Sequence, residues 1–298
     1  MIYPWLDDVH QQLNTSFNAG RFHHGQLFNG QQGVGKRALV EELANALLCA
    51  SAQNLVACGH CKSCQLNQAA THPDKYTVQA DGQSIGVDDI RNVSDFMHQS
   101  AAQNANKVVV INDCHKMTTA AANALLKTLE EPSPQRFLLL TTNATAQLPA
   151  TILSRCALSE VKVQDSHVSM QWIAQLNVPA YPWLNLFSHQ PLLVARWQQE
   201  EQLEVIDQLY KFATELKQGH NFSALVDIIS KDNERVRVFN LFLSEQLKQQ
   251  LLTGMDLDSY QNAQNALAEF VQNTTEILGL NLPLAVSRLA YRLRNSIK

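Results

Sequence analysis

The amino-acid sequence predicts an α/β domain built on a parallel sheet, followed by a region that is helical throughout. Short β-branched or aromatic runs alternate with amphipathic helical patterns as far as about Val163, which is typical of a parallel sheet covered by helices. From about Val205 onward the hydrophobic spacing is helical only. The chain has 298 residues, 45% hydrophobic and 17% charged, so it is long enough for about two or three domains with apolar cores.

Short segments of the first half have the composition of strands: Gln26 to Phe28, Lys75 to Val78, Lys107 to Ile111 and Phe137 to Thr141. From Val108 the third segment is continuously apolar, which predicts a central strand covered on both faces. A helix is predicted from Ala120 to Glu131, because Thr118 or Thr119 can cap its start and Pro132 ends it. Its apolar stripe consists of Ala122, Leu125, Leu126 and Leu129.

The regular alternation ends at about residue 163, and the next forty or so residues are broken by prolines and predict a small helical module. Further on, one helical face is closed by Gly254 and consists of Val236, Phe239, Leu243, Leu247 and Leu251. Near the end, Pro283 fits a first helical turn, and the stripe there consists of Leu282, Val286, Leu289 and Leu293. These changes of pattern predict domains at 1–163, 164–206 and 207–298.

The charge distribution does not favour strong independent binding to nucleic acid. Lys and Arg total 23 and Asp and Glu total 27, a formal charge of −4, and no basic tail stands out. The first residues, Met1 to Asp8, lack the pattern of a signal peptide, and no apolar run reaches the roughly 18 residues of a membrane span. We therefore expect a cytoplasmic protein, in which clustered cysteines are metal ligands more often than disulfides.

Cys49, Cys58, Cys61 and Cys64 form the pattern C-x8-C-x2-C-x2-C. Short loops between cysteines let their sulfur atoms converge on one tetrahedral metal ion, so we predict a structural zinc within residues 49–64. The alternatives are free thiols or two disulfides. Of the remaining cysteines, Cys114 is expected to lie in the core.

A phosphate loop is predicted at residues 30–37, because it follows a strand and opens a helix. Gly30, Gly33 and Gly35 allow backbone N–H groups to surround phosphate oxygens, and Lys36 supplies a cation. The next residue should be Ser or Thr, whose hydroxyl binds Mg²⁺, but it is Arg37.

The acidic half of such a site is also altered. A carboxylate that organises Mg²⁺ and a second one that activates water usually end the central strand. Here the pair is Asn112 and Asp113, so the metal loses a charged ligand and the base is one methylene shorter than Glu. We expect no ATP hydrolysis, although the retained Gly35 and Lys36 leave nonproductive nucleotide binding open.

Three further stretches resemble the clamp-loader subunits of the AAA+ family: 107–115, 121–132 and 148–156. With the cysteine spacing and the lost metal-binding residues, they are similar to the bacterial delta-prime type rather than to the ATP-hydrolysing gamma/tau type. The resemblance is strong over residues 1–165. It implies a RecA-like AAA+ domain with an embedded zinc knuckle, a small helical lid and an all-α collar.

The resemblance also implies an activity and partners. Delta-prime subunits are stators in a ring of five, together with gamma/tau and delta subunits, that places the sliding clamp on primed DNA. Such a chain would have no catalysis of its own within the DNA polymerase III holoenzyme. Alignment with this family places Leu192 where the lid would carry a nucleotide-sensing arginine.

Arg155, within the triplet Ser154-Arg155-Cys156, is expected to act as an arginine finger on a neighbouring subunit's nucleotide, because the family's triplet has that role. On position alone, an arginine paired with a local carboxylate or with solvent is the simpler interpretation. Two other functions stay open: a gamma/tau-like ATPase, supported by Lys36, and a zinc-knuckle DNA-binding module. Lys62 is the only basic residue inside the knuckle, which gives the second little support.

Overall fold

The computed structural model describes residues 2–80, 84–103, 106–215, 223–276 and 280–295. The chain forms two compact units. Unit 1 comprises Met1–Asn177 and Phe187–Leu193, and unit 2 comprises Val178–Leu186 and Val194–Lys298. No helix in the described part of the chain is long and apolar enough to cross a membrane.

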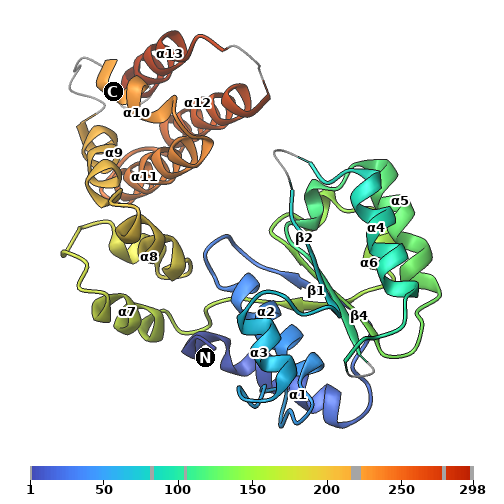
Figure 1. Cartoon of the computed structure of the whole chain (residues 1–298). Coiled ribbons are helices and arrows are strands. Elements are labelled where there is room, and N and C mark those ends of the chain that lie inside the picture. Colours follow the sequence, from blue (N-terminus) through green and yellow to red (C-terminus); the bar gives the residue numbers. More distant parts are fainter. Residues whose placement is uncertain (1, 81–83, 104–105, 216–222, 277–279, 296–298) are drawn as a thin grey trace. The chain divides into compact units, whose positions relative to one another are not determined.

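Unit 1 contains a five-stranded parallel sheet in the order β2-β3-β4-β1-β5. Strands β1, β2 and β4 of this sheet are labelled in Figure 1. The strands are β1 Gly25–Asn29, β2 Lys75–Val78, β3 Lys107–Ile111, β4 Arg136–Thr142 and β5 Ala157–Glu160. The four predicted strands are confirmed with small differences at their ends. The sequence did not reveal β5, because exposed and half-buried residues alternate along this edge strand and give no apolar run.

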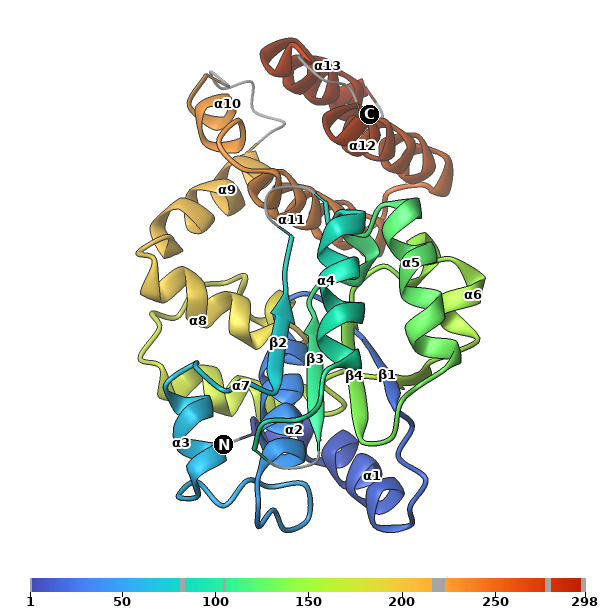
Figure 2. The same cartoon turned by 45° about the vertical axis from the view of Figure 1, so that its right-hand side comes forward.

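Helices cover both faces of the sheet (Figure 2). Along β3, Val108 and Val110 join the core under α1 Asp7–Asn18 and α2 Lys36–Leu48. Val109 and Ile111 join the core under α4 Val87–His98 and α5 Thr119–Glu130. This division confirms a central strand buried on both faces. The remaining helices of unit 1 are α3 Lys62–Gln68, α6 Ala150–Leu153 and α7 Ser166–Gln175. Short 3-10 turns lie at Pro4–Leu6, Cys114–Lys116, Thr145–Gln147 and Leu184–Phe187, and the last of these crosses into unit 2.

The start of α5 is capped as expected. Thr118 Oγ1 accepts the N–H of Ala121 at 3.2 Å, and Pro132 follows two residues after the helix ends. Three of the four predicted stripe residues are buried, and Leu126 is half-buried. The last residue of α5, Glu130, lies beside the residues that precede β5.

Unit 2 is helical within its described residues. It contains α9 Leu203–Glu215, α10 Ser223–Ile229, α11 Asn233–Leu252, α12 Leu257–Glu276 and α13 Leu282–Asn295, while α8 Pro191–Gln199 begins in unit 1. The predicted face of α11 is buried except for the half-buried Leu251, and Gly254 follows its end at φ +117°. On α13, Val286, Leu289 and Leu293 are buried.

Candidate functional site

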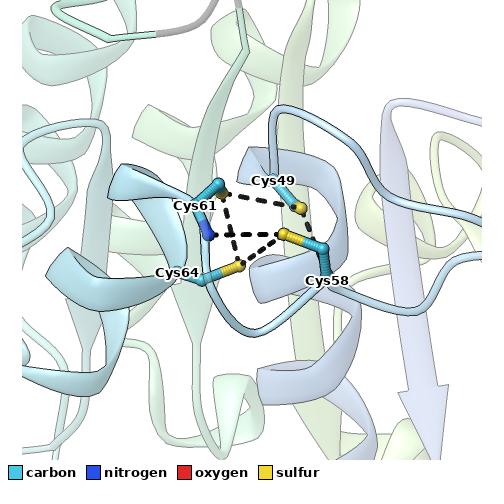
Figure 3. Close-up of side chains that lie close together, drawn as sticks. All are labelled: Cys49, Cys58, Cys61 and Cys64. Atoms are coloured by element: carbon cyan, nitrogen blue, oxygen red, sulfur yellow. Dashed lines mark hydrogen bonds between the residues drawn. The ribbon is translucent and has the colours of Figure 1, made fainter.

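The four cysteines of the predicted metal site lie together. Their sulfur atoms are all within 4.8 Å of one another, and Figure 3 shows them converging from the end of α2, the following loop and α3. The Sγ–Sγ distances are 3.8 Å for Cys49–Cys61, 3.9 Å for Cys58–Cys64 and 3.5 Å for Cys61–Cys64. Tetrahedral Zn–S bonds of ~2.3 Å place sulfur atoms ~3.8 Å apart, so this donor set fits zinc.

Hydrogen bonds around the cluster favour the thiolate form of Cys58. Cys58 N–H donates to Cys49 Sγ at 3.3 Å, and Cys61 N–H donates to Cys58 Sγ at 3.4 Å. Hydrogen bonds from Ser51 and from backbone N–H groups lower the pKa of Cys58 to about 5, whereas burial raises the pKa of Cys64 to about 12. All six cysteines lie in described residues and are free of disulfides, so the two-disulfide alternative is not observed.

The phosphate loop connects β1 to α2, as predicted, but its polar groups are engaged by the protein itself. Lys36 Nζ donates to Gly30 O at 2.7 Å and to Gln31 O at 2.9 Å, and its side chain is buried. Burial lowers the pKa of Lys36 to about 8, opposed by the charge of Asp113 and assisted by that of Arg37. The ammonium group that would bind phosphate is therefore hydrogen-bonded to carbonyl groups of the loop itself.

Residues 190–193 lie directly on the phosphate loop. The N–H of Leu192 donates to Gly33 O at 3.0 Å, and Gln190 Nε2 donates to Gln31 Oε1 at 2.9 Å. Gly33 has φ +79°, and a Cβ there would meet Leu193 Cγ at 2.6 Å. Leu192, the residue aligned with a nucleotide-sensing arginine, thus contacts the loop with backbone and apolar side chain only.

Aromatic side chains close the loop from another direction. Trp5 Nε1 donates to Val34 O at 2.7 Å, and the Tyr3 ring stacks on Trp5 with centroids 5.0 Å apart. Trp172 packs edge-on against both rings. A Cβ on Gly35 would lie 3.4 Å from the Tyr3 ring, so the cluster contacts the loop itself.

Arg37 and Asp113, which the sequence marked separately as defects, form an ion pair. Arg37 Nη2 lies 2.7 Å from Asp113 Oδ2. The carboxylate at the position expected for the water-activating base is therefore paired with a guanidinium. Asn112 is buried and accepts from Thr141 Oγ1 at 3.4 Å, so its amide also faces the protein interior.

A pocket next to the loop is lined by residues that the sequence reasoning missed. Asn29, Asn143 and Glu160 stand at the carboxyl ends of β1, β4 and β5 and line it together with Lys162 and His189. Asn29 Nδ2 donates to Glu160 Oε1 at 2.9 Å. Polar residues just after parallel strands were the available signal, since ligands bind at that edge of such sheets.

Arg155 lies at the amino ends of β1 and β5, whereas the phosphate loop lies at the carboxyl end of β1. It precedes β5, and its carbonyl oxygen would be 3.4 Å from a Cβ on Gly25, at the start of β1. The phosphate loop follows the far end of this five-residue strand, roughly 16 Å away at ~3.3 Å per residue. Arg155 is therefore too far from the chain's own phosphate loop to serve it.

Arg155 is paired with a local carboxylate, which is the simpler of the two interpretations that its position allowed. Arg155 Nη2 lies 2.8 Å from Glu130 Oε1, and Nη1 donates to Thr151 O at 3.1 Å and to Ser154 Oγ at 3.3 Å. The neighbouring Cys156 is half-buried, and burial raises its pKa to about 11. Cys114 is fully buried in the core, as predicted.

The parallel sheet, the loop after β1 and the helical second unit together define a subunit of the AAA+ type. The family model described as DNA polymerase III, delta subunit, matches residues 5–165. DNA polymerase III subunit delta′ of Yersinia pestis is 34% identical over 268 residues, covering 85% of this chain and 78% of that protein. The chain belongs to the delta-prime family of DNA polymerase III clamp-loader subunits.

Other comparisons agree on family and fold. Subunit delta′ of Haemophilus influenzae is 40% identical over 173 residues, covering 58% of this chain and 53% of the relative. The chain spans about half the length of the first two relatives that it matches, at 53% and 52%. A DNA polymerase III gamma subunit-related protein of Thermotoga maritima has a similar fold, with a TM-score of 0.57, 19% identity and coverage of 96% of this chain and 100% of that one.

Proposed function

We propose that this chain is a clamp-loader stator that neither hydrolyses ATP nor needs Mg²⁺. The observation that carries the proposal is the 2.7 Å ion pair between Arg37 and Asp113, because hydrolysis requires a free carboxylate at the position of Asp113 to activate water. A fixed cation at this position repels Mg²⁺ and neutralises the one acidic group left. Asn112 adds no negative charge to attract the metal.

The closed phosphate loop supports the same proposal. Phosphate oxygens bind to free backbone N–H groups and to a lysine ammonium. Here Lys36 is held by Gly30 O and Gln31 O, and residues 190–193 cover Gly33. A nucleotide would have to displace these contacts without the help of a metal ion.

Arg155 is proposed to act on a nucleotide held by a neighbouring subunit. Its side chain is 36% exposed. It lies at the amino ends of the strands, and the chain's own phosphate loop lies at their carboxyl ends. A guanidinium offered in trans stabilises the charge of a transferring phosphoryl group and is worth ~10³ to 10⁵ in rate. Ser154 and Cys156 flank it just before β5, and Ser154 Oγ accepts a hydrogen bond from its guanidinium.

The cysteine cluster is proposed to hold one structural Zn²⁺. Four sulfur donors fill a tetrahedral site, so no position is left for water or substrate. The metal would tie the end of α2 to α3, because Cys49 ends the first helix while Cys61 and Cys64 begin the second.

The partners are proposed from the family. Residues 1–163 would be the RecA-like domain, 164–206 the lid, and 207–298 the collar through which gamma/tau and delta subunits join in a ring of five. Exposed apolar side chains on the last helices, such as Leu284 and Tyr291, support an assembling surface there. The complex would load the sliding clamp onto primed DNA for DNA polymerase III.

Calorimetric titration of the chain with ATP, with and without Mg²⁺, tests the proposal together with a phosphate-release assay. We expect no turnover and no strengthening of binding by Mg²⁺, since both metal-positioning groups are replaced. Mg²⁺-dependent hydrolysis that disappears in Lys36→Ala would establish the gamma/tau-like alternative. Tight DNA binding that weakens steeply with salt would establish the zinc-knuckle DNA-binding alternative.

A further inference from the structure

Glu130 contacts the guanidinium of Arg155 from a helix end where a carboxylate is unfavourable. It is the last residue of α5, and Glu131 follows it directly. The carboxyl end of a helix carries partial negative charge, so two glutamates there repel the helix dipole as well as each other. The position of Glu130 is therefore explained better by its partner, 2.8 Å away, than by the stability of α5.

The acceptors around Arg155 fix both terminal nitrogens of its side chain. Glu130 takes Nη2 from one side, while Thr151 O and Ser154 Oγ take Nη1 from the other. Guanidinium is planar, so two anchored nitrogens set the orientation of the whole group. Arginine has five N–H donors, and three contacts leave donors for a ligand.

Among these acceptors, Glu130 is the one that carries a charge. Charge-assisted hydrogen bonds are about twice as strong as neutral ones, so the carboxylate dominates the restraint. A long arginine side chain otherwise samples many rotamers, and that freedom would be lost on reaching a phosphate. A residue that restricts the rotamers beforehand lowers the entropy lost in the transition state.

We propose that Glu130 is a positioning residue, which holds Arg155 in the orientation that reaches the neighbouring subunit's γ-phosphate. The proposal rests on the trans role of Arg155 proposed above and deepens it. Glu130 acts through Arg155 and does not itself touch the nucleotide, so its effect must vanish when Arg155 is absent.

The test is a double-mutant cycle in the reconstituted clamp-loader complex with clamp and primed DNA. Glu130→Gln, Arg155→Ala and the double variant are compared by steady-state ATP hydrolysis at matched assembly. We expect Glu130→Gln to lower kcat roughly two- to fivefold, the range of a half-exposed ion pair, with KM for ATP unchanged. The double variant should hydrolyse ATP at the rate of Arg155→Ala alone.

Glu131→Gln is the matched control, since it removes the same charge at the same helix end from an exposed side chain. Its rate should equal that of the unchanged chain, and Glu130→Asp should fall between the unchanged chain and Glu130→Gln. A second measurement uses NMR on the chain alone. The guanidinium N–H protons of Arg155 should exchange faster with water in Glu130→Gln than in the unchanged chain.

Each other outcome overturns the proposal in a recognisable way. A higher rate in Glu130→Gln would mean that the carboxylate restrains Arg155 instead of positioning it. An equal loss in the Arg155→Ala background, or in Glu131→Gln, would mean a structural or general charge effect. If Arg155→Ala itself leaves hydrolysis unchanged, the trans role fails first, and Glu130 has nothing to position.

Discussion

Gly33→Ala tests the closure of the phosphate loop, because the added methyl group would enter the contact between the loop and residues 190–193. Gly33 has φ +79°, and its Cβ would lie 2.6 Å from Leu193 Cγ, 3.0 Å from Leu193 N and 3.2 Å from Gln190 O. The left-handed conformation costs an alanine ~1–2 kcal/mol, and overpacking against backbone atoms adds ~1–3 kcal/mol. We expect the free energy of unfolding to fall by ~2–5 kcal/mol.

Gly20→Ala is the matched control for this experiment. Gly20 also has a left-handed backbone, at φ +65°, but a Cβ there would meet nothing within 4 Å. It should therefore show the conformational cost alone, ~1–2 kcal/mol. The difference in unfolding free energy between the two variants therefore reports the packing of residues 190–193 against Gly33.

The assay is urea unfolding of the full chain followed by circular dichroism, with m values compared so that the same transition is measured. Leu193→Ala removes the closest atom, so Gly33→Ala should cost less in the Leu193→Ala background than in the unchanged chain, while Gln190 O still obstructs the methyl group. Equal destabilisation by Gly33→Ala and Gly20→Ala would refute the closure.

Two further predictions concern the metal site and the finger. Cys61→Ser should lower zinc content and stability together, because the proposed metal would link α2 to α3 and its binding energy would contribute to folding; elemental analysis of unchelated protein checks this, and four titratable thiols with no metal would contradict it. Arg155→Ala should slow ATP hydrolysis and clamp loading by the complex while leaving assembly intact, and Arg155→Lys should restore little, since an ammonium lacks the planar fork; rates equal to those of the unchanged subunit would make Arg155 structural.

Local patterns were sufficient to predict most of the sheet and the convergence of the cysteines. The continuous apolar run from Val108 to Ile111 identified a strand buried on both faces, because burial on both sides removes the alternation of polar residues. The cysteines lie within sixteen residues of one another, and short loops alone bring their sulfur atoms together. By contrast, β5 is an edge strand of mixed polarity, whose place depends on pairing with β1.

The contacts that decide the chemistry of the site join residues distant in sequence. Arg37 and Asp113 were each recognised as unusual, but their ion pair spans 76 positions, and spacing gives no sign of it. The contact between Gly33 and Leu192 spans a still longer interval. Such pairings follow from how β1, β3 and the start of α8 meet in unit 1, which is a property of the fold.

The retained Lys36 shows why a motif and its activity are separable. A lysine after a glycine-rich loop is valuable for hydrolysis when its ammonium is free to bind phosphate and a metal ion shares the charge. In this chain the ammonium instead donates to Gly30 O and Gln31 O and so bridges two carbonyl groups of the loop. Lys36 therefore has a structural reason to be present even where no nucleotide is hydrolysed. Under the proposed function, Arg37→Thr alone would return a hydroxyl to the loop without restoring hydrolysis, because Asn112 would still bring no charge to a metal ion and residues 190–193 would still cover Gly33.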